Sequence, residues 1–312
     1  MKLNKYFLPL VIIAFAFFII GFGVGINGIM VPILEQTFSL SKGMSYLVLT
    51  ATFSAFLLFG GPSGWVVRKI GYKKSLIIAL FIMSLGMFLF IPSARMSASM
   101  AGFYLFLVAS FIGGIGNTLL QTTINPYVAI IEPVEKAAQR MCLMGIMNQS
   151  AWFLGPIFLS LFIDVKNPML VNAAIPFGMA AGIIALFALA MIFIPLPEIT
   201  AEGEVEEEEN GNNELVIAAN RKKSIWQFPH LLLGVFALFI YVGVETLPMA
   251  SVIDFARSIG VDSPARYSMI GPVGMISGYL ISIFSLQWLS QSKGLIIFSL
   301  IALISSILLT VL

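Results

Sequence analysis

Long apolar runs alternate with short polar segments along the whole chain. Nine of these runs are close to or above the roughly 20 apolar residues that a helix needs to cross a bilayer. They cover Tyr6–Leu34, Ser45–Val67, Ser75–Ser93, Ala101–Ile131, Met141–Ile163, Leu170–Leu196, Phe228–Ile253, Arg266–Leu289 and Gly294–Leu312. The pattern predicts an all-α membrane protein with nine transmembrane helices.

A charged stretch divides the nine predicted spans into six and three. Residues 198–226 contain EGEVEEEENGNNE and then RKK, without apolar periodicity. Such a segment is typical of a solvated, flexible linker, and a partner-binding tail is the alternative. We therefore expect a six-helix transmembrane half at 1–197, a cytoplasmic linker at 198–226, and the incomplete start of a second transmembrane half at 227–312.

The composition supports the membrane assignment and removes several classes of function. Hydrophobic residues make up 59% of the chain, charged residues 10%, and the mean hydropathy is +0.99, unlike an average soluble domain. One cysteine and one histidine give neither a disulfide framework nor a four-ligand zinc site. The net charge of +2 gives no nucleic-acid signal. Because the sequence contains no nucleophile elbow or His/Cys/acid cluster, an enzyme is the weakest interpretation.

The basic residues predict the orientation of the chain. With the N-terminus in the cytoplasm, twelve of the 17 lysines and arginines fall on cytoplasmic segments. The five on the other side are Lys42, Arg95, Lys166, Arg257 and Arg266. The positive-inside rule therefore favours a cytoplasmic N-terminus, with Lys73 and Glu207 inside and Asp262 outside.

The most informative stretch is GGIGNTLLQTTINPY, residues 113–127, inside the fourth predicted span. Asn117, Gln121 and Asn125 recur every four residues, so a helix places the three amides on one stripe. Unpartnered amides are costly in lipid, so the stripe must face other helices or a water-filled cavity. Pro126 is expected to open the helix there, as in the broken helices of transporter binding sites. Plain hydrogen-bonded contact between helices is the alternative.

Three other spans carry candidate site residues. In the first, Asn27 follows the closely spaced Gly21 and Gly25, which allow another helix to approach. The fifth contains Asn148, Gln149 and Trp152, and the seventh contains Tyr241 and Glu245. Amides suit sugar hydroxyls, and an indole face suits the apolar face of a sugar ring. For Asn27 and Trp152 the alternative is helix packing or interfacial anchoring.

The segment PSGWVVRKIGYKK, residues 62–74, is expected to be a short basic loop between two spans. It resembles the major facilitator superfamily, whose loop between the second and third helices has a glycine, an acid, a base, a second glycine and further basic residues. The matching residues are Gly64, Lys69, Gly71 and Lys73. Arg68 stands where that family usually has an aspartate. The resemblance therefore implies a gating loop that locks two helices, without implying the family's charge relay.

Further motifs resemble the fucose–galactose–glucose symporter family of that superfamily, and most of all its glucose/galactose branch. They are NGI (27–29), Pro32, QTTINPY (121–127), EPVEKAAQR (132–140), MGIMNQ (144–149), PLPE (195–198) and FPHLLLGVFALFIYVGVE (228–245). The resemblance implies a major facilitator fold and secondary active transport of a hexose by alternating access. It also implies a monomer in the bacterial inner membrane, with a sugar as its partner and no cofactor besides a coupling ion, H⁺ or Na⁺.

Gly28 and Gln121 stand where the fucose branch has an aspartate and a glutamate, so proton coupling through these two positions is not implied. Glu245, the acid well inside a predicted span, is then the coupling candidate. The family has twelve spans, whereas the ninth predicted span reaches Leu312, so we expect a fragment of a longer transporter. The alternatives are a transporter-derived membrane sugar sensor and a non-transporting fragment.

Overall fold

The computed structural model describes residues 6–97, 99–131, 134–163, 169–198, 224–261 and 264–311. Within these ranges every regular element is a helix. The α-helices are α1 (Phe7–Thr37), α2 (Lys42–Ser45), α3 (Leu47–Arg95), α4 (Met100–Ile130), α5 (Ala137–Ser160), α6 (Ala174–Phe193), α8 (Pro229–Ser258), α9 (Ile270–Ser285) and α10 (Gln291–Val311). Short 3-10 helices are η1 (Val134–Lys136), η2 (Leu170–Ala173), η3 (Ile225–Gln227) and η4 (Pro264–Met269). Eight helical segments of the described chain are long and apolar enough to cross a membrane.

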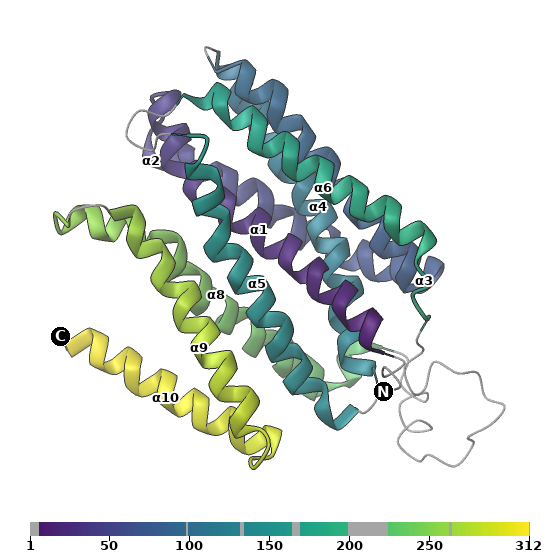
Figure 1. Ribbon diagram of the computed structural model, residues 1–312. Helices are drawn as coiled ribbons and strands as arrows, with labels where there is room; N and C mark the ends of the chain where they lie inside the picture. Colours follow the sequence, from purple (N-terminus) through teal and green to yellow (C-terminus); the bar gives the residue numbers. More distant parts are fainter. Residues whose placement is uncertain are drawn as a thin grey trace. The chain divides into compact units, whose positions relative to one another are not determined.

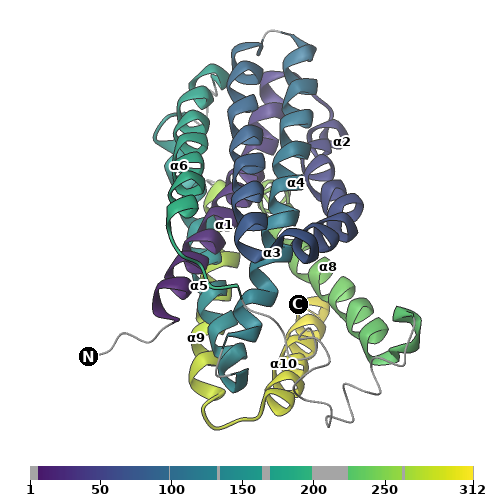
Figure 2. The same cartoon turned by 90° about the vertical axis from the view of Figure 1, so that its right-hand side faces the viewer.

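The chain divides into two compact units, which we describe separately. One unit comprises Met1–Glu198 and Pro272–Leu312, and the other comprises Ile199–Gly271 and contains α8. In the first unit, α1 to α6 form a bundle of helices that lie side by side (Figures 1 and 2). Most of the predicted linker, residues 199–223 with Glu207, lies outside the described residues, as does Asp262. The predicted division into six and three spans stays a prediction.

α3 is 49 residues long and turns back on itself at Gly71. A straight helix of that length would measure roughly 74 Å, more than twice the thickness of a bilayer core. Gly71 is not helical, with φ 82° and ψ 172°. Thr52 before it and Met83 after it both lie against α4, beside Gly114 and Gly116. Gly114 and Gly116 lie within one turn of α4, so residues from both sides of Gly71 reach the same level of α4, and the chain doubles back between them.

The loop predicted for residues 62–74 is wrong in extent. The first arm of α3 stays helical up to Ile70 and the second resumes directly after Gly71. The basic residues that suggested a loop are compatible with a helix end, because long cationic side chains extend from it into water. The turn therefore needs one residue with a positive φ, which glycine adopts without strain.

α1 and α5 pack so closely that their backbones touch at glycines. A Cβ atom added at Gly21 would overlap the backbone carbonyl of Asn148, and one added at Gly25 would lie 2.7 Å from the carbonyl oxygen of Trp152. The Asn148 side chain donates from Nδ2 to the carbonyl oxygen of Phe17 at 3.1 Å. The close approach predicted from the glycine spacing in the first span is confirmed.

A buried aromatic cluster joins α3, α4 and α6. The ring of Phe90 lies 4.3 Å from that of Phe106 and 4.5 Å from that of Phe177, centroid to centroid, and all three side chains are almost fully buried. Such aromatic contacts add stabilisation to the area they bury. They hold the second arm of α3 against α4 and α6, next to the polar part of α4.

Arg140, at the start of α5, closes the end of α4. Its guanidinium is buried and donates to the carbonyl oxygens of Val128, at 3.1 Å, and of Ala129 and Ile131. The last carbonyls of a helix have no partner within the helix, and a cation beside them also interacts favourably with the helix dipole. This contact ties the end of α4 to α5.

Candidate functional site

The amide stripe of α4 is present and partly paired along the helix. Asn117 is 4% exposed, and its Oδ1 accepts a hydrogen bond from Gln121 Nε2 at 3.1 Å. Gln121 and Asn125 are half-buried. The stripe therefore faces the interior of the protein at one end and a partly accessible region at the other.

The opening of α4 expected at Pro126 was wrong. The helix runs without interruption from Met100 to Ile130. A proline removes one hydrogen bond and crowds the preceding turn, which can be absorbed by a gentle bend when neighbouring helices hold the chain. In the preceding turn, the hydroxyl of Thr122 donates to the carbonyl oxygen of Thr118 at 2.8 Å.

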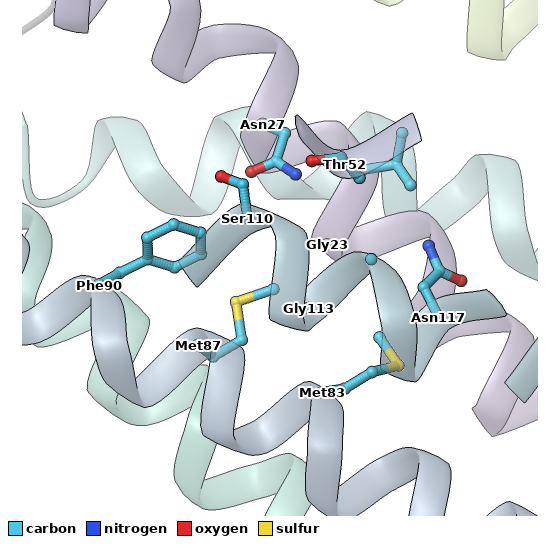
Figure 3. A pocket seen from close by; sticks show the side chains of 11 residues that line it. Gly23, Asn27, Thr52, Met83, Met87, Phe90, Ser110, Gly113 and Asn117 are labelled. Atoms are coloured by element: carbon cyan, nitrogen blue, oxygen red, sulfur yellow. The ribbon is translucent and has the colours of Figure 1, made fainter. Parts of the chain in front are cut away.

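A small cavity lies between α1, both arms of α3, and α4, beside the amide stripe (Figure 3). Asn27 of α1, Thr52 of α3, and Ser110 and Asn117 of α4 supply its polar lining. Glycines, Val24, Met83, Met87 and Phe90 supply the remainder. The cavity volume of about 20 Å³ corresponds to space for about one water molecule, which needs roughly 10–15 Å³ by the same measure.

Two oxygen atoms at this cavity have no hydrogen-bond partner among the described residues. Asn27 Oδ1 and Ser110 Oγ are both buried, with the side chains 7% and 2% exposed. In Figure 3 these two oxygen atoms point into the same space. Buried polar atoms are normally hydrogen-bonded, so this pair is suited to a water molecule or to a hydroxyl group of a ligand.

The polar residues of α5 have separate tasks. Asn148 uses its amide nitrogen to bind the backbone of α1, so this donor serves the contact between helices. Gln149 is 3% exposed, and its Oε1 has no hydrogen-bond partner among the described residues. Trp152 is half-buried, and its backbone faces Gly25. Gln149 therefore offers an available acceptor, and Trp152 takes part in helix packing.

In the other unit, Tyr241 and Glu245 lie one turn apart on α8. The side chain of Tyr241 is 53% exposed, and its hydroxyl forms a hydrogen bond with the half-buried carboxyl group of Glu245. This pairing agrees with their helical spacing. The amides of α1, α4 and α5 belong to the first unit, and Tyr241 and Glu245 form a separate pair.

The residues proposed for a gating loop do not lie in one cluster. Arg68 is exposed, Lys69 Nζ lies 4.7 Å from the centroid of the Trp65 ring, and Gly64 has open space around it. Gly71 and Lys73, in contrast, belong to a compact cluster that includes Glu198. The backbone N–H groups of Tyr72 and Lys73 donate to the Glu198 carboxylate at 2.9 and 3.1 Å.

Sequence reasoning missed Glu198 and Ser110. Ser110 precedes Asn117 by seven residues, two helical turns, so extending the amide stripe backwards would have found it. Glu198 is 126 residues from Tyr72 along the chain, and no local pattern connects the two.

Comparisons with known proteins agree on the family and the fold. The Major Facilitator Superfamily model matches residues 13–312. A glucose/galactose transporter of Brucella abortus biovar 1 (strain 9-941) is 29% identical over 310 residues, 96% of this chain and 72% of the relative. A putative glucose/galactose transporter of Helicobacter pylori (strain ATCC 700392 / 26695) is 30% identical over 260 residues, 79% of this chain and 60% of the relative.

A more distant relative is a fucose symporter, and a solved structure of the transporter FucP also matches this chain. The L-fucose-proton symporter of Escherichia coli (strain K12) is 23% identical over 325 residues, 96% of this chain and 72% of the relative. The crystal structure of the major facilitator transporter FucP in the outward conformation matches with a TM-score of 0.73 at 21% identity. The match covers 96% of this chain and 76% of that one, which shows that the two share a fold.

Proposed function

Because this chain belongs to the major facilitator superfamily, in its fucose–galactose–glucose symporter branch, we propose that it carries a hexose of the glucose or galactose type across the membrane. Members of this superfamily are transporters and not enzymes. The chain is a multi-pass membrane protein, and we assign it to the bacterial inner membrane with a cytoplasmic N-terminus. The names of the relatives at 29% and 30% identity support the choice of sugar.

The observation that carries this proposal is the set of unpaired polar atoms in an apolar helix bundle. Asn27 Oδ1, Ser110 Oγ and Gln149 Oε1 are buried without partners among the described residues. A sugar hydroxyl can donate to an amide oxygen and accept from an amide nitrogen or a hydroxyl group. Hexose hydroxyls, or the water molecules that they displace, would complete the hydrogen bonds of these atoms.

The size of the cavity limits how a sugar can use it. A volume of about 20 Å³ admits about one water-sized group, so a single hydroxyl fits and a whole hexose ring does not. The ring would then lie beside the cavity, next to Asn117 and its partner Gln121. One hydroxyl at the end of the sugar would reach Asn27 Oδ1 and Ser110 Oγ.

The experiment compares two buried serines whose hydroxyls both lack a partner among the described residues. Ser110 lines the cavity, whereas Ser75, which is 0% exposed, is absent from its lining. We expect Ser110→Ala to weaken hexose binding by roughly tenfold, about 1.4 kcal/mol, because a desolvated sugar hydroxyl loses its partner. Ser75→Ala should leave the Kd unchanged.

Isothermal titration of the purified protein with glucose and galactose gives both Kd values. Uptake into proteoliposomes then separates a carrier from a sensor, since a sensor binds the sugar without moving it. Equal Kd values for the Ser110→Ala and Ser75→Ala variants would show that the cavity is not part of the sugar-binding site. Loss of binding by both would point to a general effect on folding.

A further inference from the structure

Three segments that are distant in sequence meet around Glu198. Its Oε2 accepts the N–H of Tyr72 at 2.9 Å and its Oε1 accepts the N–H of Lys73 at 3.1 Å. Lys73 Nζ donates to the carbonyl oxygen of Ile192 at 3.1 Å. The hydroxyl of Tyr127 donates to the carbonyl oxygen of Pro197 at 2.9 Å. We call this group of residues the Glu198 staple; it joins the turn of α3 to the ends of α4 and α6.

The carboxylate sits where the second arm of α3 needs an acceptor. Gly71 interrupts the helix, so the first N–H groups after it have no carbonyl one turn earlier. A carboxylate that accepts two of them satisfies these donors and interacts favourably with the positive end of the helix dipole. Lys73 provides the reciprocal contact, because it donates to a carbonyl in the last turn of α6.

The backbone favours glycine at position 71, and the carboxylate lies directly against it. Its φ of 82° lies in the left-handed region, which glycine tolerates better than other residues. A Cβ atom there would also lie 2.9 Å from both carboxylate oxygens of Glu198. The turn is therefore shaped around the carboxylate. Arg68 occupies the position where an acid was expected by resemblance, and the acid at this turn comes instead from residue 198.

The staple reaches the amide stripe through Tyr127. This side chain is fully buried, and its ring packs edge-on against that of Tyr72, with centroids 5.6 Å apart and an interplanar angle of 71°. Tyr127 lies two residues after Asn125 and six after Gln121. Arg140 ties the same end of α4 to α5, and the Tyr127 hydroxyl ties it to the segment that Glu198 anchors.

We propose that Glu198 is a positioning residue. Its carboxylate keeps the Pro197 carbonyl within hydrogen-bond distance of the Tyr127 hydroxyl, and thereby sets the position of Gln121 and Asn125 on α4. All members of the staple belong to Met1–Glu198 of the first unit, so it is expected to remain closed while the transporter changes conformation. The part of this inference that concerns sugar rests on the proposed function. The part that concerns the helices does not.

Hydrogen–deuterium exchange tests the helical part without any ligand. In Glu198→Ala we expect faster exchange at the backbone amides of Tyr72 and Lys73, and also in the segment 121–131 of α4. Glu35→Gln, a substitution in the last turn of α1, serves as the control and should change neither segment. Faster exchange at Tyr72 and Lys73 alone would mean that the carboxylate caps α3 but does not position α4, which would overturn the proposal.

Hexose binding tests the functional part. We expect Glu198→Ala to raise the Kd about fivefold, an effect of the size of a lost helix cap, with a smaller rise for Glu198→Gln, which keeps one acceptor oxygen. Tyr127→Phe removes the other end of the same connection. The double variant Glu198→Ala/Tyr127→Phe should therefore bind hexose no more weakly than the weaker-binding single variant. Additive losses would contradict the connection. If the exchange pattern is as expected and no hexose binds to the wild type, the staple stands and the proposed function fails.

Discussion

Replacement of Gly25 by alanine tests the close contact between α1 and α5. The added Cβ atom would lie 2.7 Å from the carbonyl oxygen of Trp152 and 2.9 Å from its Cα atom. Both are backbone atoms that cannot rotate away, so the helices must separate by roughly 0.5 Å to reach ordinary contact distances. The hydrogen bond from Asn148 to Phe17, now 3.1 Å, would then exceed the range in which hydrogen bonds are effective.

The expected loss of stability combines two effects. Overpacking costs about 1–3 kcal/mol, and the loss of a hydrogen bond between helices costs roughly 0.6 kcal/mol. Gly28 provides the matched control on the same helix, because a Cβ atom there meets nothing within 4 Å. Gly28→Ala should be neutral, or stabilising by up to about 1 kcal/mol through its better helix propensity.

The assay is thermal unfolding of both variants in the same detergent, followed by circular dichroism and by the reactivity of Cys142. We expect a clearly lower apparent Tm for Gly25→Ala and an unchanged or higher one for Gly28→Ala. Equal values for the two variants would refute the reasoning, since they differ in the space available and not in the chemistry of the change.

Three further results are expected. Gln121→Ala should weaken hexose binding by on the order of 1–3 kcal/mol with folding nearly intact, as measured by titration and apparent Tm; parallel losses of expression and binding would show that the amide only joins helices. In a background without Cys142, a cysteine at Lys73 should be protected from impermeant reagents added outside intact cells and one at Asp262 should react; the reverse labelling would overturn the orientation. Glu245→Gln should retain sugar exchange in proteoliposomes and lose accumulation driven by an imposed H⁺ or Na⁺ gradient, because it removes the change of charge; undiminished accumulation would exclude this residue from coupling.

The sequence predicted those features that arise from local periodicity. Apolar runs located the helices of the bundle, and the spacing of Gly21 and Gly25 predicted a close helix contact, because side chains four residues apart share a face. The pairing of Asn117 with Gln121 has the same origin. These predictions need only the geometry of a single helix.

Features that depend on long-range contacts could not be obtained in this way. The single-residue turn at Gly71 is possible because Glu198, far along the chain, supplies the acceptor for the helix that follows. α4 continues through Pro126, although local sequence rules predicted an opening there. The unpaired oxygens of Asn27 and Ser110 share a cavity because α1 and α4 face each other across it. No spacing within one helix contains this information.

The measurement that tests the central claim most directly is counterflow in proteoliposomes that contain the purified protein. Vesicles are loaded with unlabelled glucose or galactose and diluted into a trace of the labelled sugar. Transport by alternating access predicts a transient accumulation of label above its equilibrium level, reduced in the Ser110→Ala variant and unchanged in Ser75→Ala. Saturable hexose binding by the same preparation without any counterflow would contradict the account.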